Sequence, residues 1–591
     1  MSTNWNLDVL YKGFSDPNFL ADLENVDGVI SKFSDTIDTL LSSSDLCTEE
    51  KLNIYIDALI SLYTHIGKLS TFLSLSISVD SNNDLAQKFR VQLSTKISRI
   101  KEPVTRMEDF ICQIPDLHSL ISNSAKLKEY EFILSEIKRQ HKYTLSAKEE
   151  GIISKLRTTG SSAWTSYKNK LISTHTVKIE KDSQITKLPL TEVLNMAHSP
   201  NPDLRKQAYE AELKSYSKIE EGIAAALNAI KGEALTESNL RGYHSILGMT
   251  LINSMMSDKT LEAMFSALED SLPDFRKYLK RKSEILGHKN GLPWYDMYAP
   301  VSSKTKEYTY DQAKAFIIKH FGSFSQKLAD FAQKAIDNDW VDVYPKPGKV
   351  GGAFCAGLGS IRESRILLNY GNSIKDVTTF AHELGHGFHN QCLDNESMLN
   401  RNYPMPLAET ASIICETIVK KAAMLSADAD EKLTILESEL SASTQVIVDI
   451  YSRFLFEESF INARKDGYVS VDQIKSLMVD SQLKAYGDGL DKNVLHPYMW
   501  TWKSHYYSAT RNFYNFPYAF GLLFAKGLYA KYLDDKLNFP AKYEQLLSVT
   551  GKLSVENVAA TMDIDLTQKD FWTASFNIIK DDINLFLSLT S

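Results

Sequence analysis

Apolar residues recur at steps of three and four along much of this chain, which is the spacing of amphipathic helices. The first such stretch runs from Leu52 to Ser76, with apolar positions at Ile54, Ile56, Leu59, Leu62, Ile66 and Leu69. A second stretch, from Leu85 to Ile100, is stopped by Pro103, and the strongest one runs from Asp203 to Leu235. These patterns predict a mainly α-helical protein.

The segment from Gly348 to Tyr370 departs from the helical pattern. It carries several glycines and then the apolar run Arg365-Ile-Leu-Leu-Asn-Tyr370, which is flanked by polar residues. This composition predicts a small hairpin or short sheet. We expect a helix directly afterwards, starting at Asn372 or Ser373 with Asp376 behind it, and running through Val377, Phe380, Leu384 and Phe388.

The first third of the chain contains one interruption of the helical pattern. A polar stretch with β-forming residues, Thr176–Glu180, is followed by the loop Ser199-Pro-Asn-Pro-Asp203. We place the internal boundary at this loop. The division predicts a helical domain over residues 1–198 and a second domain over residues 199–591.

Composition supports long helices and narrows the choice of partners. Only 26 Gly and 16 Pro occur in 591 residues, so turns are few. The formal net charge of −8 is mild for this size and argues against a nucleic-acid partner. No run of 18 uncharged apolar residues suggests a membrane span. Five scattered cysteines without a C-x-x-C pair indicate reduced thiols, so we expect a cytoplasmic protein.

The expected helix after the glycine-rich segment contains His382-Glu-Leu-Gly-His386. Two histidines four positions apart share one face of a helix, so both imidazoles can reach the same metal ion. Glu383 lies beside that ion without binding it, where it can take a proton from a metal-bound water. The motif therefore predicts a catalytic zinc site, while a coincidental surface pattern is the simpler alternative.

Catalytic zinc needs a third protein ligand and one open position. A histidine ten residues after the first, as in metzincins, is excluded because position 392 is Cys392. The acidic residues that remain as candidates for the third ligand are Asp394, Glu396, Glu409 and Glu416. Glu416 lies on the same helical face as Glu409 and could support the site from behind the ligands.

His389 follows His386 by three positions on a similar face. A third ligand so close would strain tetrahedral geometry. We therefore expect His389 to be a core histidine or to support the ligands indirectly.

The glycines between Gly351 and Gly359 match neither G-x-x-x-x-G-K-[ST] nor G-x-G-x-x-G, which argues against a phosphate-binding loop. Small residues permit close approach of another backbone, and an adjacent strand offers N–H and C=O groups. Gly351, Gly352 and Ala353 are therefore expected to bind the backbone of a peptide.

The ordered motifs of the chain resemble the oligoendopeptidase F branch of the thimet-oligopeptidase-like zinc metallopeptidases. The resemblance covers most of the chain. It rests on His382–His386 with Leu407-Ala-Glu-Thr-Ala-Ser412, and on further segments: Trp5-Asn-Leu7 with Leu10-Tyr11, Arg241-Gly-Tyr243, Tyr295-Asp-Met-Tyr298-Ala-Pro300, Gly351-Gly-Ala-Phe-Cys355, and His505-Tyr-Tyr507 with Phe513-Tyr-Asn-Phe-Pro-Tyr518-Ala-Phe-Gly521.

This resemblance implies a two-lobed helical metallopeptidase with a small β-sheet beside the active-site helix and a deep substrate channel. It also implies one Zn²⁺ on His382, His386 and Glu409, with Glu383 as general base, and short unfolded oligopeptides as substrates that are cut at internal bonds. In this frame residues 1–198 are the N-terminal helical domain of the oligopeptidase F type and residues 199–591 the catalytic domain. Where many relatives have a tyrosine, this chain has Phe516.

The aromatic segment admits two interpretations. Pro517 suits the first turn of a helix capped by Asn515 or Phe516, which leaves His505–Tyr514 as a loop. We expect His505, Tyr514 and Tyr518 to donate hydrogen bonds to a developing oxyanion, against the alternative that they pack in the core. Core packing is expected for the three phenylalanines Phe513, Phe516 and Phe520.

Two other functions remain compatible with the sequence. One is a zinc carboxypeptidase or dipeptidyl carboxypeptidase of similar helical fold, which would need an Arg or Lys for a terminal carboxylate. The other is a peptide-binding protein with a vestigial site. The complete set of His382, Glu383, His386 and Glu409 argues against the second.

Overall fold

The computed structural model describes residues 3–181, 184–301 and 306–591, and it is mainly α-helical, as predicted. The chain divides into two compact units, each assembled from three separate segments. The first unit comprises residues 1–142, 306–423 and 532–564, and the second comprises residues 143–305, 424–531 and 565–591. The proposed boundary at residue 198 is a division along the sequence and stays a prediction. None of the described helices is both long and apolar enough to cross a membrane.

The first unit contains a small sheet and the helices that surround it. Its helices are α1 Pro17–Glu24, α2 Val26–Ser42, α3 Thr48–Val79, α4 Asp84–Ile97, α5 Lys101–Gln113, α6 Leu117–Ser122, α7 Ala125–Glu129, α8 Glu131–His141, α16 Tyr310–Phe324, α17 Gln326–Asp337, α18 Ile374–Cys392, α19 Thr410–Ser426 (which continues into the second unit), α25 Phe539–Ser548 and α26 Val555–Ala560.

The second unit is built from longer helices and one hairpin. Its elements are α9 Ala147–Thr159, α10 Ser161–Thr174, β1 Thr176–Lys181, β2 Gln184–Pro189, α11 Leu190–Asn195, α12 Pro202–Ser215, α13 Glu220–Leu240, α14 Ile246–Asn253, α15 Asp258–Ile285, α20 Ala429–Thr444, α21 Ile450–Lys465, α22 Val471–Tyr486, α23 Met499–Trp502, α24 Phe516–Asp534 (which continues into the first unit) and α27 Lys569–Thr590.

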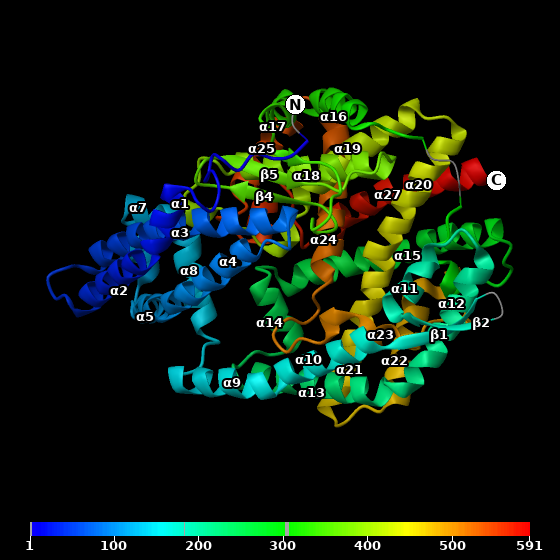
Figure 1. Ribbon diagram of the computed structural model, residues 1–591, viewed down its shortest axis with the longest axis horizontal. Helices are drawn as coiled ribbons and strands as arrows, with labels where there is room; N and C mark the ends of the chain where they lie inside the picture. The colour runs from blue at the N-terminus through cyan, green and yellow to red at the C-terminus, as the bar shows by residue number, and fades with distance from the viewer. Residues whose placement is uncertain (1–2, 182–183, 302–305) are drawn as a thin grey trace. The chain divides into compact units, whose positions relative to one another are not determined.

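The predicted small sheet lies in the first unit and has the strand order β3-β5-β4. Its strands are β3 (Val341–Asp342), β4 (Phe354–Leu358) and β5 (Glu363–Leu367). β4 and β5 form an antiparallel hairpin, whereas β3 pairs in parallel with β5. Because β5 is central, the outer edge of β4 is free of a partner strand among the described residues. α18 runs along this sheet (Figure 1).

The core of the first unit joins the amino-terminal helices to the sheet. Aromatic rings meet edge to face in its centre, for example Tyr11 with Phe19 at a centroid distance of 5.3 Å and with Phe72 at 5.2 Å. Leu358 of β4 and Leu367 of β5 belong to the same buried cluster. The sheet that borders the metal helix therefore rests on the same core as α1–α8.

Two predicted elements differ in detail from the structure. The helix expected over Asp203–Leu235 is broken into α12 and α13 by a 3₁₀ turn at Tyr216–Lys218. There the Ser215 hydroxyl donates to the carbonyl of Glu212 at 2.7 Å, and such local bonds compete with the helical ladder. Pro103 does not end a helix; α4 ends at Ile97, and Pro103 lies in the first turn of α5, where its missing N–H costs nothing.

Candidate metal centre

α18 positions both histidines of the H-E-x-x-H motif. The helix begins after Ser373, which forms a capping box with Asp376: the Asp376 N–H donates to Ser373 Oγ at 3.2 Å, and the Ser373 N–H donates to Asp376 Oδ2 at 2.9 Å. Of the two start residues considered, Ser373 is therefore the cap. His382 and His386 follow on the same face of the helix, one turn apart, and both are partly buried.

Glu409 lies directly before α19 and completes a cluster with the two histidines. Its Oε2 is 3.2 Å from His382 Nε2 and 3.6 Å from His386 Nε2, and potential ligand atoms of all three residues lie within 4.8 Å of one another. Nitrogen and oxygen ligands of a tetrahedral zinc ion, at roughly 2.0–2.1 Å from the metal, lie about 3.3 Å from one another. The three residues thus fit one zinc ion.

Gly385, between the two histidines, permits the helix crossing that brings Glu409 to them. A Cβ atom at this position would lie 2.6 Å from the Cα of Ser412 and 2.7 Å from the carbonyl oxygen of Ala411, both in the first turn of α19. Only glycine tolerates so close an approach. The sequence motif contains this glycine, but its role depends on a neighbour that the sequence alone does not reveal.

Glu416, one further turn along α19, holds His382 from behind. Glu416 Oε2 lies 3.2 Å from His382 Nδ1, and Lys420 pairs with the other oxygen of the same carboxylate. With Nδ1 held in this way, Nε2 is the ring nitrogen that faces Glu409. A carboxylate behind a histidine fixes the tautomer and the ring orientation that a metal ligand needs.

The charges of the cluster are strongly coupled. Burial opposes a charge on His382, but hydrogen bonds to Glu409 and Glu416 raise its pKa to about 10. Burial also opposes a charge on Glu409, but the hydrogen bond from His382 and the nearby histidines lower its pKa to about 2. Burial and the charge of His382 lower the pKa of His386 to about 4. Two histidines and a carboxylate thus converge on one point, with a second carboxylate behind His382, and this donor set favours a positive ion.

Glu383 lies beside the cluster but in a different environment. Only 5% of the residue is exposed, and burial raises the pKa of its carboxyl to about 7. The nearest part of the sheet is β4, whose Cys355 thiol has its pKa raised by burial and by the charge of Glu383. A carboxyl group with a pKa near neutrality can both accept and return a proton.

Asp394, Glu396 and His389 lie away from the cluster. The backbone carbonyl of Asp394 accepts a hydrogen bond from Arg401 Nη2 at 3.1 Å, and Glu396 pairs with Lys552 at 2.6 Å. His389 is fully buried, its ring stacks on Tyr403 at 4.2 Å, and its Nε2 lies 2.8 Å from Thr550 Oγ1. These contacts leave Glu409 as the acidic partner of His382 and His386.

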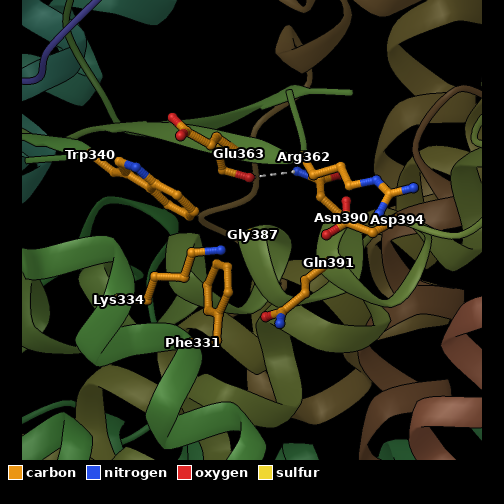
Figure 2. A pocket seen from close by; sticks show the side chains of 10 residues that line it. Phe331, Lys334, Trp340, Arg362, Glu363, Gly387, Asn390, Gln391 and Asp394 are labelled. Carbon is orange, nitrogen blue, oxygen red and sulfur yellow. Dashed lines mark hydrogen bonds between the residues drawn. The ribbon is translucent and has the colours of Figure 1, made fainter. Parts of the chain in front are cut away.

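The face of α18 one turn beyond Glu383 and His386 is packed against α17 and β5. Figure 2 shows the Phe331 ring of α17 pointing at Gly387, where a Cβ atom would lie 2.5 Å from the ring. Asn390, on the next turn, donates to Ser364 Oγ of β5 at 3.3 Å. The small cavity between them has a volume of about 10 Å³, room for about one water molecule. This packing fixes the helix that carries the histidines.

Gly351, Gly352 and Ala353 lie in the bend that leads into β4. Gly352 has φ +82°, a left-handed conformation that favours glycine. Asn369 holds the bend by donating to the carbonyls of Val350 at 3.0 Å and Gly352 at 2.8 Å. Gly351 and Gly352 are exposed, so their backbones are accessible next to the free edge of β4.

His505, Tyr514 and Tyr518 belong to the second unit. His505 lies in the 3₁₀ turn Ser504–Tyr506, its Nε2 is buried without a hydrogen-bond partner among the described residues, and burial lowers its pKa to about 2. The Tyr518 hydroxyl donates to that of Tyr514 at 3.3 Å. Pro517 lies in the first turn of α24, as predicted. The three phenylalanines of the segment are buried, also as predicted: Phe513, Phe516 and Phe520.

Comparison with known proteins assigns the family. The family model described as "Peptidase family M3" matches residues 195–578, and the one described as "Oligopeptidase F" matches residues 112–175. The chain belongs to peptidase family M3. This M3 peptidase is 24% identical to the oligoendopeptidase F homolog of Lactococcus lactis subsp. lactis (strain IL1403), over 98% of this chain and 96% of the relative. It is 22% identical to the oligopeptidase PepF of Bacillus subtilis (strain 168), over 88% of this chain and 78% of the relative.

Solved structures share its fold. A structure titled as a putative peptidase from Chlamydophila abortus has a TM-score of 0.85 with 21% identity, covering 100% of this chain and 99% of that one. The oligoendopeptidase-F from Enterococcus faecium has a TM-score of 0.70 with 17% identity, covering 97% and 98%. The predicted oligoendopeptidase F resemblance is thereby confirmed. The M3 peptidase is a metallo-oligopeptidase that acts on peptides.

Proposed function

We propose that the metal is zinc and that His382, His386 and Glu409 hold it. The observation that carries the proposal is the convergence of these three donors at distances that a tetrahedral site requires. When bound, zinc supplies Lewis-acid activation of a water molecule and of the scissile carbonyl group. Glu416 keeps His382 in the ligating tautomer, and His389 secures α18 through Thr550.

Glu383 is the proton carrier of the proposed reaction. It accepts the proton of the attacking water as the water oxygen adds to the peptide carbonyl, and it then delivers a proton to the leaving nitrogen as the C–N bond breaks. Its raised pKa of about 7 suits both steps, because the carboxylate is basic enough to accept the proton and the acid is strong enough to return it at neutral pH.

The peptide backbone binds along β4 in this proposal. The free edge of β4 supplies N–H and C=O groups for strand addition, and Gly351, Gly352 and Ala353 extend that edge without bulky side chains. Only an unfolded segment can add to a strand in this way. The proposed substrates are therefore short unfolded oligopeptides that are cut at internal bonds. The names of two relatives, an oligoendopeptidase F homolog and an oligopeptidase PepF, agree with oligopeptide substrates.

The oxyanion that forms on the peptide carbonyl needs hydrogen-bond donors besides the metal. We assign this role to His505, Tyr514 and Tyr518. A neutral donor avoids placing a second charge in a dry site, and burial keeps His505 neutral by lowering its pKa. We place the protein in the cytoplasm, because all five cysteines are free thiols, which suits a reducing compartment.

Two variants test the assignment of metal and base together. Glu383→Gln keeps the shape of the site but removes its basicity, so we expect zinc content near one per chain and a kcat lowered by roughly 10²–10⁴. His386→Ala should lose both zinc and activity. The measurements are metal analysis and peptide turnover of both variants. A zinc-loaded Glu383→Gln enzyme with normal kcat would refute the role of Glu383. Full zinc occupancy in His386→Ala would refute the ligand set.

A further inference from the structure

A large cavity in the first unit lies at one end of the proposed peptide-binding strand. Its volume is about 840 Å³, within the range of about 300–1,000 Å³ that is usual for ligand pockets. Its walls are helices α3, α5 and α8 on one side and, on the other, the β4–β5 turn with the segment that follows α18 (Figure 1 shows these elements). Most of the lining is apolar, contributed for example by Leu59, Ile133 and Leu399.

One carboxylate in this cavity has no counter-ion. Burial and the charge of Asp109 raise the pKa of Glu108 against the opposing charge of His141, which itself lies 3.3 Å from Asp109. No described cation lies within ion-pair distance of Glu108. Its charge in turn raises the pKa values of Tyr55 and Tyr63, which line the same cavity, although burial is the larger cause at both tyrosines. A carboxylate and two aromatic rings that line the same cavity offer an environment for an ammonium group.

The other charged residues of the cavity have hydrogen-bond acceptors or opposite charges nearby. Arg401 uses its guanidinium on backbone carbonyls, donating to those of Glu396 at 3.0 Å, Gly359 at 2.7 Å and Asp394 at 3.1 Å. Glu363 is 2.9 Å from Arg365. Burial raises the pKa of Asp394, and the charges of Arg401, Arg362 and Lys334 oppose that rise. Among the described acids of the lining, Glu108 has neither an ion pair nor a lysine or arginine acting on its pKa, so its surroundings suit a cation better than a carboxylate.

The cavity also adjoins the metal centre along the chain's own elements. The cavity is lined at the end of β4 by Gly357, Leu358 and Gly359. In the same strand, the pKa of the Cys355 thiol is raised by burial and by the charge of Glu383. Tyr403, another lining residue, stacks on His389 one turn beyond His386. The distance from Cys355 to Leu358 is three residues of strand, about 10 Å.

A peptide on the free edge of β4 can run in either direction, and the charge of the cavity selects one. An antiparallel peptide places its amino-terminal end beyond Leu358, where Glu108 would attract an ammonium group. A parallel peptide would bring its terminal carboxylate to the same uncompensated acid. The antiparallel direction is therefore favoured.

We propose that this cavity receives the amino-terminal end of the peptide and that Glu108, which lines it together with Tyr55 and Tyr63, binds the α-ammonium group of that peptide. The inference rests on the proposed zinc peptidase function. It assigns to this chain a preference for peptides with a free amino terminus and for bonds located a few residues from that end.

The test compares one peptide series with a free and with an acetylated amino terminus, using wild-type enzyme, Glu108→Gln and Glu102→Gln. Glu102 is an exposed acid on the same helix and serves as the matched control. We expect the wild-type kcat/KM to be about tenfold higher for the free than for the acetylated peptide. This ratio should fall to about one in Glu108→Gln and stay near ten in Glu102→Gln. An acetylated peptide that begins with lysine distinguishes a side-chain ammonium from the terminal one.

Three results would overturn the proposal. A wild-type ratio near one, an unchanged ratio in Glu108→Gln, or full recovery by the acetylated lysine peptide would each exclude the assigned role. If Glu108→Gln does not fold, Leu59→Phe is the alternative variant, because it narrows the cavity and leaves Glu108 in place. It should move the cleaved bond toward the amino terminus of the peptide. Unchanged cleavage positions would count against binding of the peptide in this cavity. Absence of chelator-sensitive cleavage with every peptide would instead refute the proposed function itself.

Discussion

The metal centre in the first unit and the aromatic segment 503–518 in the second unit are held in place by different means. At the metal centre two features are local, the histidines one turn apart and the capping box at Ser373, and one is a contact between helices, the close approach of α19 to Gly385. The aromatic segment depends on partners far away in the sequence. Lys231 holds Asn512 at 2.7 Å, Lys168 donates to the carbonyl of Trp502 at 3.3 Å, and Thr165 donates to that of Tyr507 at 3.0 Å.

This difference determines how each region can place its functional groups. A metal ligand must keep its position within a few tenths of an ångström, and short-range helical geometry provides that precision. The aromatic segment is a loop in which Phe513 has φ +51°. Such a loop positions its tyrosine hydroxyls and its imidazole only through its tertiary contacts. Perturbing each region separately should therefore give distinct phenotypes.

The largest separate effect is expected at the tyrosines of the aromatic segment. Tyr514→Phe and Tyr518→Phe each delete one hydroxyl and leave ring packing intact. Loss of one oxyanion donor lowers kcat by about a hundredfold or more, with little change in substrate binding. Because the Tyr518 hydroxyl donates to that of Tyr514, we expect unequal effects, measured as kcat and KM with a fluorogenic peptide.

Zinc content should stay normal in both tyrosine variants, which sets them apart from changes at the metal centre. If both keep the wild-type kcat, the tyrosines only line the substrate site or pack in the core. His505 would then be the remaining donor of the three.

An intermediate effect is expected at Glu416. Glu416→Gln keeps the size of the side chain but weakens its hold on His382 Nδ1, and loss of such a partner costs roughly 10–100-fold in metal affinity. The measurement is a competition titration with a zinc chelator. Glu396→Gln is the matched control, because Glu396 pairs with Lys552 away from the ligands and should leave the affinity unchanged. Equal affinities in wild type and Glu416→Gln would contradict the supporting role.

The smallest effect is expected at the helix crossing. Gly385→Ala introduces a Cβ atom 2.6 Å from the backbone of α19, so the helices must separate at a cost of about 1–3 kcal/mol and Glu409 must move. Gly151→Ala is the control, since nothing lies within 4 Å of that position in α9 and alanine is the better helix former. Thermal unfolding and zinc affinity report both changes. A Gly385→Ala protein as stable as Gly151→Ala would show that the crossing is not tight.

The same contrast accounts for what could be predicted from the sequence. Helical periodicity predicts α3, and the glycine-rich interruption predicts the β4–β5 hairpin, because both patterns are local. The spacing of His382 and His386 predicts their shared face. The proposed ligand Glu409 could not be chosen over Asp394 or Glu416 without the family resemblance, since its position depends on the approach of Ala411 and Ser412 to Gly385.

Other features are tertiary and left no signal in the sequence. The break between α12 and α13 lies where Tyr216 is fully buried against His175. The apolar periodicity of the sequence continues across this point, although the helix is interrupted there. The two compact units are each made of three segments, which no single boundary in the sequence could express. In the sequence Glu108 cannot be told apart from a surface acid. Its place in a cavity follows only from the tertiary structure, because residues of α3 and α8 line the same cavity.

The most direct test of the account is product mapping by mass spectrometry. A set of unfolded peptides of increasing length and one stable folded protein are incubated with the enzyme as purified, after chelation, and after chelation followed by added zinc. We predict cleavage at internal bonds of the short peptides, loss of cleavage on chelation, recovery with zinc, and an intact folded protein. Cleavage that survives complete removal of metal, release of only carboxyl-terminal residues or dipeptides, or efficient internal cleavage of the folded protein would contradict it.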